Sequence, residues 1–340
     1  MAPSALSTAA AAAAGAATTP SNGVTKGAPA YAELDASKLT YERTICTDHM
    51  ITANWSADAG WAAPKLHPYG PLSLMPTASV LHYATECFEG LKVYRGFDGR
   101  LRLFRPDCNA RRMLEKLMIA LLAVDGARWI PKSRPGTFLY LRPTMIGTQS
   151  QLGVMASREA MLYIICSFMP IMDSPPAASA SAPPRGHGPC LVRWDARDAG
   201  FHQILWLYGP EALCTEAGAS NFFVLWKPKE GGKPQLEERP RAREERCPEI
   251  DVVERKYTIR ELEEAYDEGR IIESFAAGTA FFICPISVVN HRGKNLEASM
   301  GASGEGGDYT LKVRQWLKDI MYGAEPDHKW AVVITEEGEE

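Results

Sequence analysis

Four blocks of the sequence gather charged, aromatic and glycine residues that could bind an anionic ligand with an apolar part. They are "LHYATECFEGLKVYRGFDGRLRLFRPDCNARRML" (81–114), "LYLRP" (139–143), "TEAGASNFF" (215–223) and "GTAFFICP" (278–285). A guanidinium suits a phosphate or a carboxylate because its fork donates two parallel hydrogen bonds. Gly278 permits a turn, and the small residues after Glu216 indicate a backbone that approaches something closely.

Each of these residues also has a purely structural explanation. By position alone Arg112 could be a helix-surface arginine, Glu216 a solvated loop glutamate and the Thr279 segment a surface turn. The aromatic residues could belong to the core. Arg142 is harder to explain as core, because an unpaired buried guanidinium is costly.

The four blocks, in their order and in their residues, resemble motifs of the branched-chain amino-acid aminotransferases. These are pyridoxal 5'-phosphate enzymes of fold type IV. The resemblance covers about residues 41–332. It implies a two-domain fold of α/β and α+β type, with a small α/β domain at 41–170 and a larger, β-barrel-like domain at 201–340. We expect residues 1–40 to form a disordered or targeting tail and residues 171–200 to be an aberrant interdomain segment.

The same resemblance implies roles for individual residues. Arg112 grips the phosphate of pyridoxal phosphate, Glu216 accepts a hydrogen bond from its protonated ring nitrogen, and the turn at Thr279 and Ala280 binds the phosphate and the substrate carboxylate. The substrate pocket is walled by aromatic rings, with an arginine on the carboxylate side; its residues are Tyr83, Phe88, Tyr140 and Arg142.

The implied reaction moves an amino group between leucine, isoleucine or valine and 2-oxoglutarate, in branched-chain amino-acid biosynthesis or degradation. The implied partners are these amino and 2-oxo acids and a second copy of the chain in a homodimer. Two alternatives remain. One is a D-amino-acid transaminase or aminodeoxychorismate lyase of the same fold, and the other is a catalytically silent relative that binds a partner protein.

The chain departs from the family where the catalytic lysine belongs. That lysine holds the cofactor covalently and then moves the substrate proton. Here the position is occupied by "SAPPRGHGPCLVRWDARDAG" (181–200), and no lysine occurs between Ser133 and Trp226. Lys92, Lys132 and Lys227 lie in other blocks, where we expect solvated surface amines. The sequence therefore assigns no catalytic residue.

Two interpretations account for this departure: a non-catalytic relative, or a wrongly spliced reading of a gene whose product has the lysine. The second is favoured, because the phosphate-turn region at "LEERPRAREERCPEI" and the helix after "NARRMLEKLM" are also interrupted. Each interruption adjoins intact motifs, and Glu216 and Arg112 remain. The Pro, Gly and Arg content of 172–200 and 237–248 predicts no packed strand or helix there.

The positioning elements follow from periodicity. Apolar residues at helical spacing predict a helix over 107–124, with Asp107 or Asn109 as its N-cap. Thr258 and Glu261 predict a capping box, and Gly269 the end of that helix. Short apolar runs bounded by polar residues predict strands in both domains, including "FHQILWLYG" and "ASNFFVLWKP" joined by a hairpin-like "PEALCTEAG".

Composition excludes several functions. The chain has 340 residues, of which 46% are hydrophobic, so it can build a sizeable core. Its net charge of −4 gives no excess of basic residues that would attract nucleic acid or anionic lipid. No apolar run is long enough to cross a bilayer, and no metal site is indicated. The first 30 residues lack acidic residues, as a mitochondrial targeting segment does, but they also lack the arginines that such segments carry. We therefore expect either a mitochondrial or a cytoplasmic location.

Because the family lysine is absent, this chain should not attach pyridoxal phosphate covalently. After incubation with the cofactor and borohydride reduction, mass spectrometry should find no phosphopyridoxyl group on any specific lysine. A single, stoichiometrically modified lysine would contradict this expectation.

Overall fold

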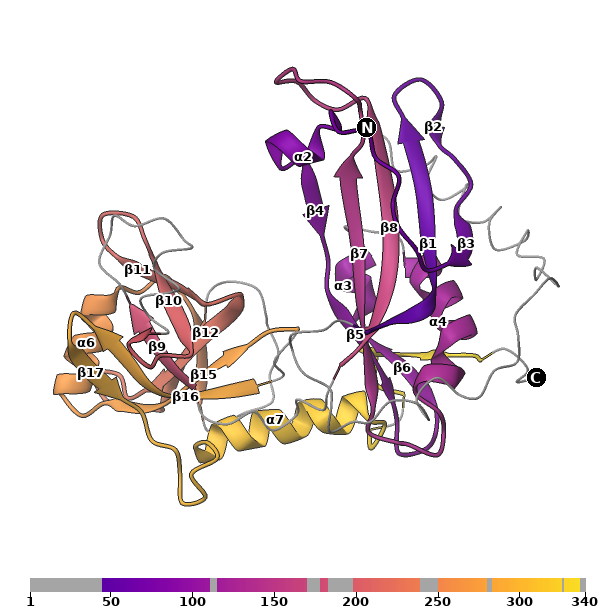
Figure 1. Ribbon diagram of the computed structural model, residues 1–340. Helices are drawn as coiled ribbons and strands as arrows, with labels where there is room; N and C mark the ends of the chain where they lie inside the picture. The colour runs from indigo at the N-terminus through magenta and orange to yellow at the C-terminus, as the bar shows by residue number, and fades with distance from the viewer. Residues whose placement is uncertain are drawn as a thin grey trace. The chain divides into compact units, whose positions relative to one another are not determined.

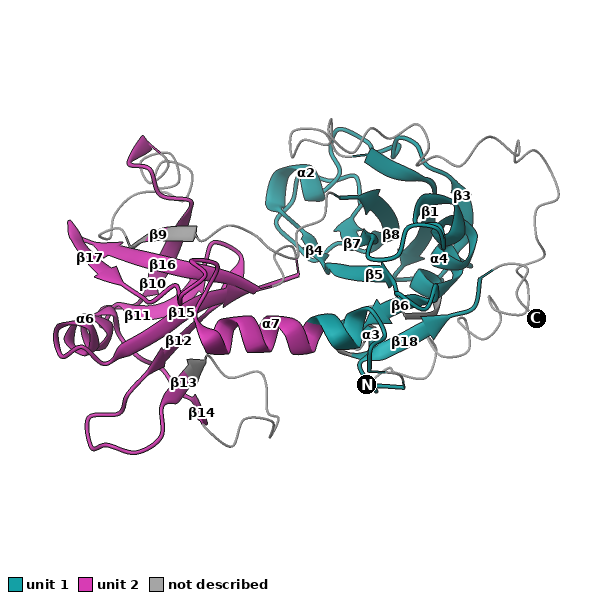
Figure 2. Ribbon diagram, turned by 90° about the horizontal axis from the view of Figure 1, so that it is seen from below, with its two compact units in different colours: residues 1–171, 318–340 teal, residues 172–317 magenta. Residues whose placement is uncertain are grey.

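The computed structural model describes residues 45–110, 115–169, 178–182, 198–238, 250–279, 283–325 and 327–336 (Figure 1). The expected tail at 1–40 lies outside these residues. The chain divides into two compact units, residues 1–171 with 318–340 and residues 172–317, which Figure 2 distinguishes by colour. Helix α7 (Asp308–Met321) begins in unit 2 and ends in unit 1.

Unit 1 is built on a nine-stranded sheet in which every pairing between described strands is antiparallel. Its main path runs in the order β18 (Ala331–Ile334), β6 (Leu101–Phe104), β5 (Leu91–Arg95), β7 (Phe138–Gly147), β8 (Glu159–Phe168), β1 (Ile45–Ser56) and β2 (Gly60–Trp61). Strand β3 (Lys65–Pro68) pairs with β1, and β4 (Glu86–Phe88) pairs with β7.

Helix α4 (Glu115–Trp129) covers one face of this sheet. Its buried residues Leu117, Met118, Leu121 and Leu122 join the strand residues of that face in one core. This stripe is the one that the periodicity predicted. The N-cap expectation was wrong, because α3 (Pro106–Ala110) already begins at Pro106, where a proline needs no helical hydrogen-bond partner for its nitrogen.

The end of the chain returns to unit 1. Strand β18 pairs with β6, and beyond it Glu336 receives two hydrogen bonds from Arg95, at 2.6 and 2.7 Å, with both side chains buried. The Arg95 Nε also donates to the Ile130 carbonyl. The sequence places 201–340 in one domain, whereas these pairings attach the last strand to the N-terminal unit.

Unit 2 contains a second nine-stranded sheet, ordered β11-β10-β9-β16-β15-β12-β13-β14, with β17 paired to β16. The strands are β9 (Ala178–Ala182), β10 (Gln203–Tyr208), β11 (Leu213–Ala217), β12 (Ser220–Trp226), β13 (Gln235–Glu238), β14 (Asp251–Glu254), β15 (Ile271–Ala277), β16 (Ile283–His291) and β17 (Lys294–Glu297). The expected hairpin-like link at 210–218 thus contains strand β11.

Strand β9 overturns part of the expectation for residues 172–200. It runs parallel to both β10 and β16, and Ala180 is buried at 1% exposure. Small side chains allow this strand to fit between two neighbours, so Pro and Gly content nearby did not exclude a packed strand. Most of 172–200 and of 237–248 lies outside the described residues.

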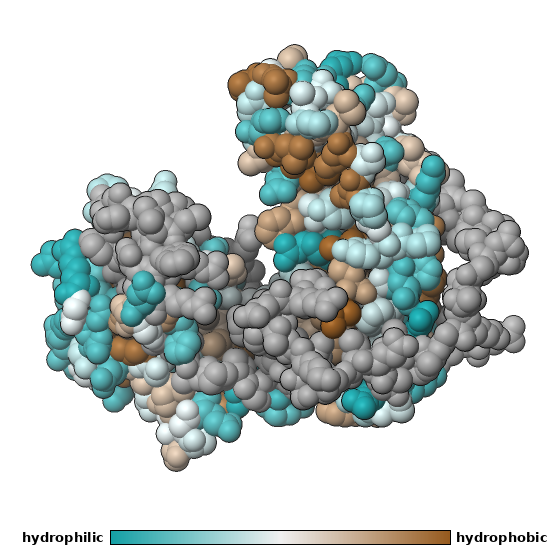
Figure 3. Space-filling view, in the orientation of Figure 1, coloured by the Kyte–Doolittle hydropathy of each residue, from teal (hydrophilic) through white to brown (hydrophobic). Residues whose placement is uncertain are grey.

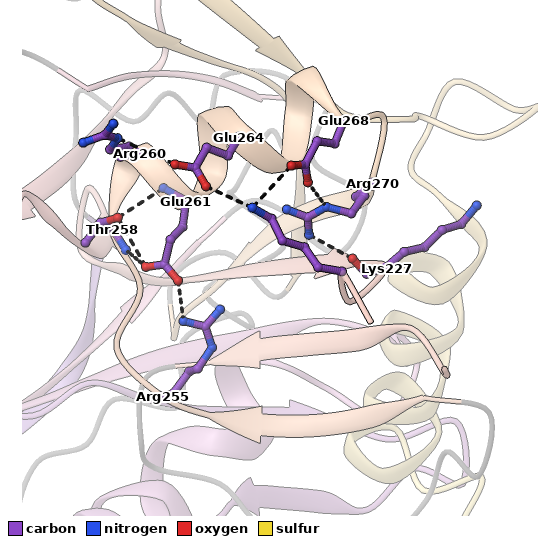
Figure 4. Close-up of polar contacts among 9 residues, drawn as sticks. Lys227, Arg255, Thr258, Arg260, Glu261, Glu264, Glu268 and Arg270 are labelled. Atoms are coloured by element: carbon purple, nitrogen blue, oxygen red, sulfur yellow. Dashed lines mark hydrogen bonds and ion pairs between the residues drawn. The ribbon is translucent and has the colours of Figure 1, made fainter. Parts of the chain in front are cut away.

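Helix α6 (Ile259–Asp267) begins with the predicted capping box (Figure 4). The Thr258 hydroxyl accepts a bond from the Glu261 N–H at 3.1 Å, and the Glu261 carboxylate accepts one from the Thr258 N–H at 2.8 Å. Partial burial raises the pKa of Glu261. The hydrogen bonds that its carboxylate accepts from Thr258 and Arg255 lower the pKa by more than burial raises it, so the net pKa lies below its ordinary value. Gly269 adopts the left-handed conformation just after the helix.

Replacing the cap should destabilise unit 2 locally. We expect Thr258→Ala to lower the free energy of unfolding by about 1 kcal/mol, because the Glu261 amide loses its acceptor at the helix N-terminus. Urea denaturation measures this. The matched control is Arg260→Ala, since that side chain is 86% exposed and only pairs with Glu264 along the helix; it should change stability by less than about 0.5 kcal/mol. Equal effects of the two variants would contradict the capping role.

Candidate functional site

The residues of β5 and β7 alternate between the core and a second face of the unit 1 sheet. Leu91 and Leu141 point into the core covered by α4, and they are direct partners across the two strands. Lys92 and Tyr140 are also partners, and because successive side chains point to opposite faces, they lie on the second face with Arg142. Alternation along β7 therefore places Tyr140 and Arg142, two residues apart, on the same face.

Three predicted substrate residues meet on this face, and we call them the Arg142 cluster: Phe88, Tyr140 and Arg142. The guanidinium carbon of Arg142 lies 4.4 Å from the Phe88 ring centre and 5.1 Å from the Tyr140 ring centre. Its Nη2 donates a hydrogen bond of 2.7 Å to the Tyr140 hydroxyl. The two rings attract the cation and hold its plane in place.

The guanidinium of Arg142 is not fully hydrogen-bonded within the described residues. Its Nε is buried and has no hydrogen-bond partner among the described residues, while the residue as a whole is half-buried. A guanidinium offers five N–H donors and no acceptor, so the groups best suited to complete it are oxygens of an anion. The arrangement can bind a carboxylate beside an apolar surface.

The aromatic residues of the site differ in burial. Tyr140 is 8% exposed, as core packing would also produce, but Phe88 is 56% exposed and Tyr83 is 37% exposed. Tyr83 ends helix α2 (Val80–Tyr83), and its hydroxyl donates to the Leu152 carbonyl at 2.7 Å. Tyr83 is thus tied to the β7–β8 loop rather than to the Arg142 cluster.

In unit 2 a second set of predicted residues gathers at one end of the sheet, and we call it the Glu216 edge: Glu216, Gly278 and Thr279. Glu216 on β11 pairs with Asn221 on β12, which pairs with Ala277 on β15. These two pairings place Glu216 two strand spacings, or about 10 Å, from Ala277. Thr279 follows Ala277 by two residues. Arg112 and Ala280 lie outside the described residues.

Two glycines let the backbone approach closely at this edge. Gly218, with φ +66°, lies against the Gln203 amide, and its carbonyl accepts a bond from Trp206 Nε1 at 2.9 Å. A Cβ at Gly278 would lie 2.5 Å from Ser220 Oγ. The close approach that the sequence predicted after Glu216 is therefore made with side chains of the protein itself.

The Glu216 edge fits part of pyridoxal phosphate. A carboxylate and a hydroxyl-bearing turn lie at one end of the sheet, as the cofactor's ring nitrogen and its phosphate require. Among the described residues, the two lysines next to β12 are not placed for covalent attachment, because Lys227 and Lys229 follow the opposite end of β12 from Asn221. Lys92 is not the surface amine that we expected, being 4% exposed with its Nζ 4.1 Å from the Phe138 ring centre.

The fold matches solved aminotransferase structures. The branched-chain aminotransferase of Thermoproteus uzoniensis superposes with a TM-score of 0.60 at 18% identity, covering 83% of this chain and 99% of that one. The Escherichia coli branched-chain aminotransferase also gives 0.60, at 17% identity and 85% and 100% coverage. The protein thus has the two-domain architecture of the fold type IV aminotransferases, as the sequence predicted.

Curated relatives define the family within that class. The mitochondrial branched-chain-amino-acid aminotransferase of Schizosaccharomyces pombe is 36% identical over 84% of this chain and 78% of its own length. The cytosolic enzyme of Mus musculus is 34% identical over 85% and 86%. No family model matches the chain. The chain belongs to the branched-chain-amino-acid aminotransferase family, whose cofactor is pyridoxal phosphate.

The alignment also reveals internal gaps. The comparison with the Schizosaccharomyces pombe protein runs over 336 positions, yet includes only 84% of the 340 residues of this chain. The relative therefore carries residues, within the aligned region, that this chain lacks.

No helix among the described residues is long and apolar enough to span a membrane. No group of three or more His, Cys, Asp or Glu side chains is placed to hold a metal ion in that part of the chain.

Proposed function

We propose that this protein is a branched-chain amino-acid aminotransferase, which moves the amino group of leucine, isoleucine or valine to 2-oxoglutarate, forming glutamate and the branched 2-oxo acid. The observation that carries the proposal is the Arg142 cluster, where an incompletely bonded guanidinium lies between the rings of Phe88 and Tyr140. A carboxylate and an aliphatic side chain both find a partner there.

The residues of each unit take distinct roles. Arg142 binds the substrate carboxylate, and Phe88 and Tyr140 enclose the aliphatic side chain. Bound pyridoxal phosphate supplies an electron sink for the carbon that loses its proton. Glu216 keeps the proton on the cofactor's ring nitrogen, since a carboxylate stabilises the positive charge. Thr279, with Ala280 and Arg112, binds the phosphate.

We place the missing base in a segment that the relatives carry and this chain lacks. The internal gaps of the alignment support a gene product longer than this chain, with the lysine between β8 and β10. A silent, partner-binding relative or a D-amino-acid transaminase would retain the same fold, but the curated relatives named above are all branched-chain enzymes. Their names include mitochondrial and cytosolic forms, and we propose one of these two compartments.

We further propose a homodimer formed through an apolar surface on unit 1 (Figure 3). This apolar surface consists of residues from α2, β4 and the β7–β8 loop: Leu81, Tyr83, Phe88, Leu152, Val154 and Met155, which are 37–92% exposed. The parts are contiguous, because Ala78 bridges Ser150 and Tyr83 bonds to Leu152. An exposed apolar patch of this kind marks an interaction site.

Restoring the lysine segment should restore catalysis. A chain carrying the segment as the relatives have it should transaminate L-leucine with 2-oxoglutarate, and Glu216→Gln should lower turnover about tenfold for each unit lost from the ring nitrogen's pKa, since one unit is worth about 1.4 kcal/mol. Turnover is measured by glutamate formation. Glu211→Gln, an exposed glutamate in the turn before β11, is the control and should leave turnover unchanged.

The assignment fails if the restored enzyme prefers D-alanine to L-leucine, or if Glu216→Gln has no effect. A transcript that matches residues 172–200 as written would support the silent relative instead.

Charge in the apolar surface should disrupt the dimer. Val154 is 92% exposed, so Val154→Asp costs the monomer little but places a charge in the interface. Sedimentation velocity should show a dimer for the parent chain and a larger monomer fraction for the variant. Val252→Asp on β14, at a residue 47% exposed in unit 2, is the control and should remain dimeric. A monomeric parent chain would refute the homodimer.

A further inference from the structure

Gly90 connects β4 to β5 beside the hydroxyl end of the Tyr140 side chain. A Cβ built on Gly90 would overlap the Tyr140 hydroxyl oxygen and would lie 3.0 Å from the ring carbon Cζ that carries it. Carbon atoms in proteins do not approach that closely, so any side chain at residue 90 must displace the tyrosine tip. The same hydroxyl accepts the 2.7 Å hydrogen bond from Arg142 Nη2.

The backbone around Gly90 has little freedom to move away. Phe88 pairs with Thr144 on β7, the Glu89 N–H donates to the Pro143 carbonyl at 2.9 Å, and Leu91 pairs with Leu141 on the same strand. Both sides of the connection are thus held by β7.

The Asn109 side chain adds a further restraint from α3. Its Nδ2 donates to the Glu89 carboxylate at 2.8 Å and lies 3.5 Å from the Gly90 carbonyl oxygen. Since the backbone is held on two sides, a new methyl group would be accommodated by movement of Tyr140.

We propose that Gly90 is a positioning residue: the missing side chain leaves the space in which the Tyr140 hydroxyl meets Arg142 and so orients the guanidinium. Arg142 Nε, which has no hydrogen-bond partner among the described residues, lies on the same edge of the guanidinium as Nη2, so the bond that holds Nη2 also sets the direction of the Nε–H. The consequence for carboxylate affinity rests on the proposed function; the geometric role does not.

The geometric role is tested first, without any ligand. In the full chain labelled with [13Cζ]tyrosine, the Tyr140 resonance is identified by its loss in Tyr140→Phe. Gly90→Ala should shift this resonance. Gly70→Ala should not, because a Cβ at Gly70 meets nothing within 4 Å. Gly90 has no positive φ, so alanine imposes no backbone strain there and circular dichroism should show a folded variant. An unmoved Tyr140 resonance in Gly90→Ala would overturn the inference.

The second arm measures the dissociation constant of 4-methylpentanoate, the carbon skeleton of leucine without its amino group. Gly90→Ala should weaken binding at least about tenfold, because a hydrogen bond to a charged group is lost from the correct geometry. In a Tyr140→Phe background the same substitution should weaken binding much less, since the overlapping oxygen is gone and only the milder 3.0 Å contact with the ring carbon Cζ remains.

The outcomes separate the two proposals. Equal weakening by Gly90→Ala in both backgrounds would show that Gly90 does not act through the hydroxyl, and would overturn the inference. A parent chain that does not bind the acid would contradict the substrate assignment, while the tyrosine resonance still decides the role of Gly90.

Discussion

The antiparallel pairing of β7 with both β4 and β5 is the constraint on which the Arg142 cluster depends. One strand presents Leu139 and Leu141 to the core beneath α4 and, by alternation, Tyr140 and Arg142 to the other face. A slip of one residue would bury the guanidinium in the core and expose the leucines. Burial of the core therefore fixes the register that builds the Arg142 cluster.

A similar constraint organises the Glu216 edge of unit 2. Strand β12 is the common neighbour of β11 and β15, so one residue, Asn221, aligns Glu216 with Ala277 and with the turn that follows. Ala217, next to Glu216, is buried in the core. In both units a buried neighbour determines where the polar residue points.

The departure at 171–200 leaves both of these arrangements in place. Strand β9, which lies within the departure, completes the sheet between β10 and β16, and the Arg142 cluster and the Glu216 edge are built from strands outside it. A chain can therefore keep the scaffold of its family and lack the residue that the reaction needs, because packing and chemistry are carried by different segments.

Local signals in the sequence determined the family, the capping box of Thr258 and Glu261, the stripe of α4, the candidate residues Arg142 and Glu216, and the absence of a lysine from 133 to 226. They depend on neighbours a few residues apart. Only the tertiary structure decided that Glu216 lies in a strand, that Lys92 is buried, that residues 178–182 enter a sheet and that Gly90 faces Tyr140. Those facts depend on which distant strands pair and in what register, and no local pattern of residue types specifies the partner.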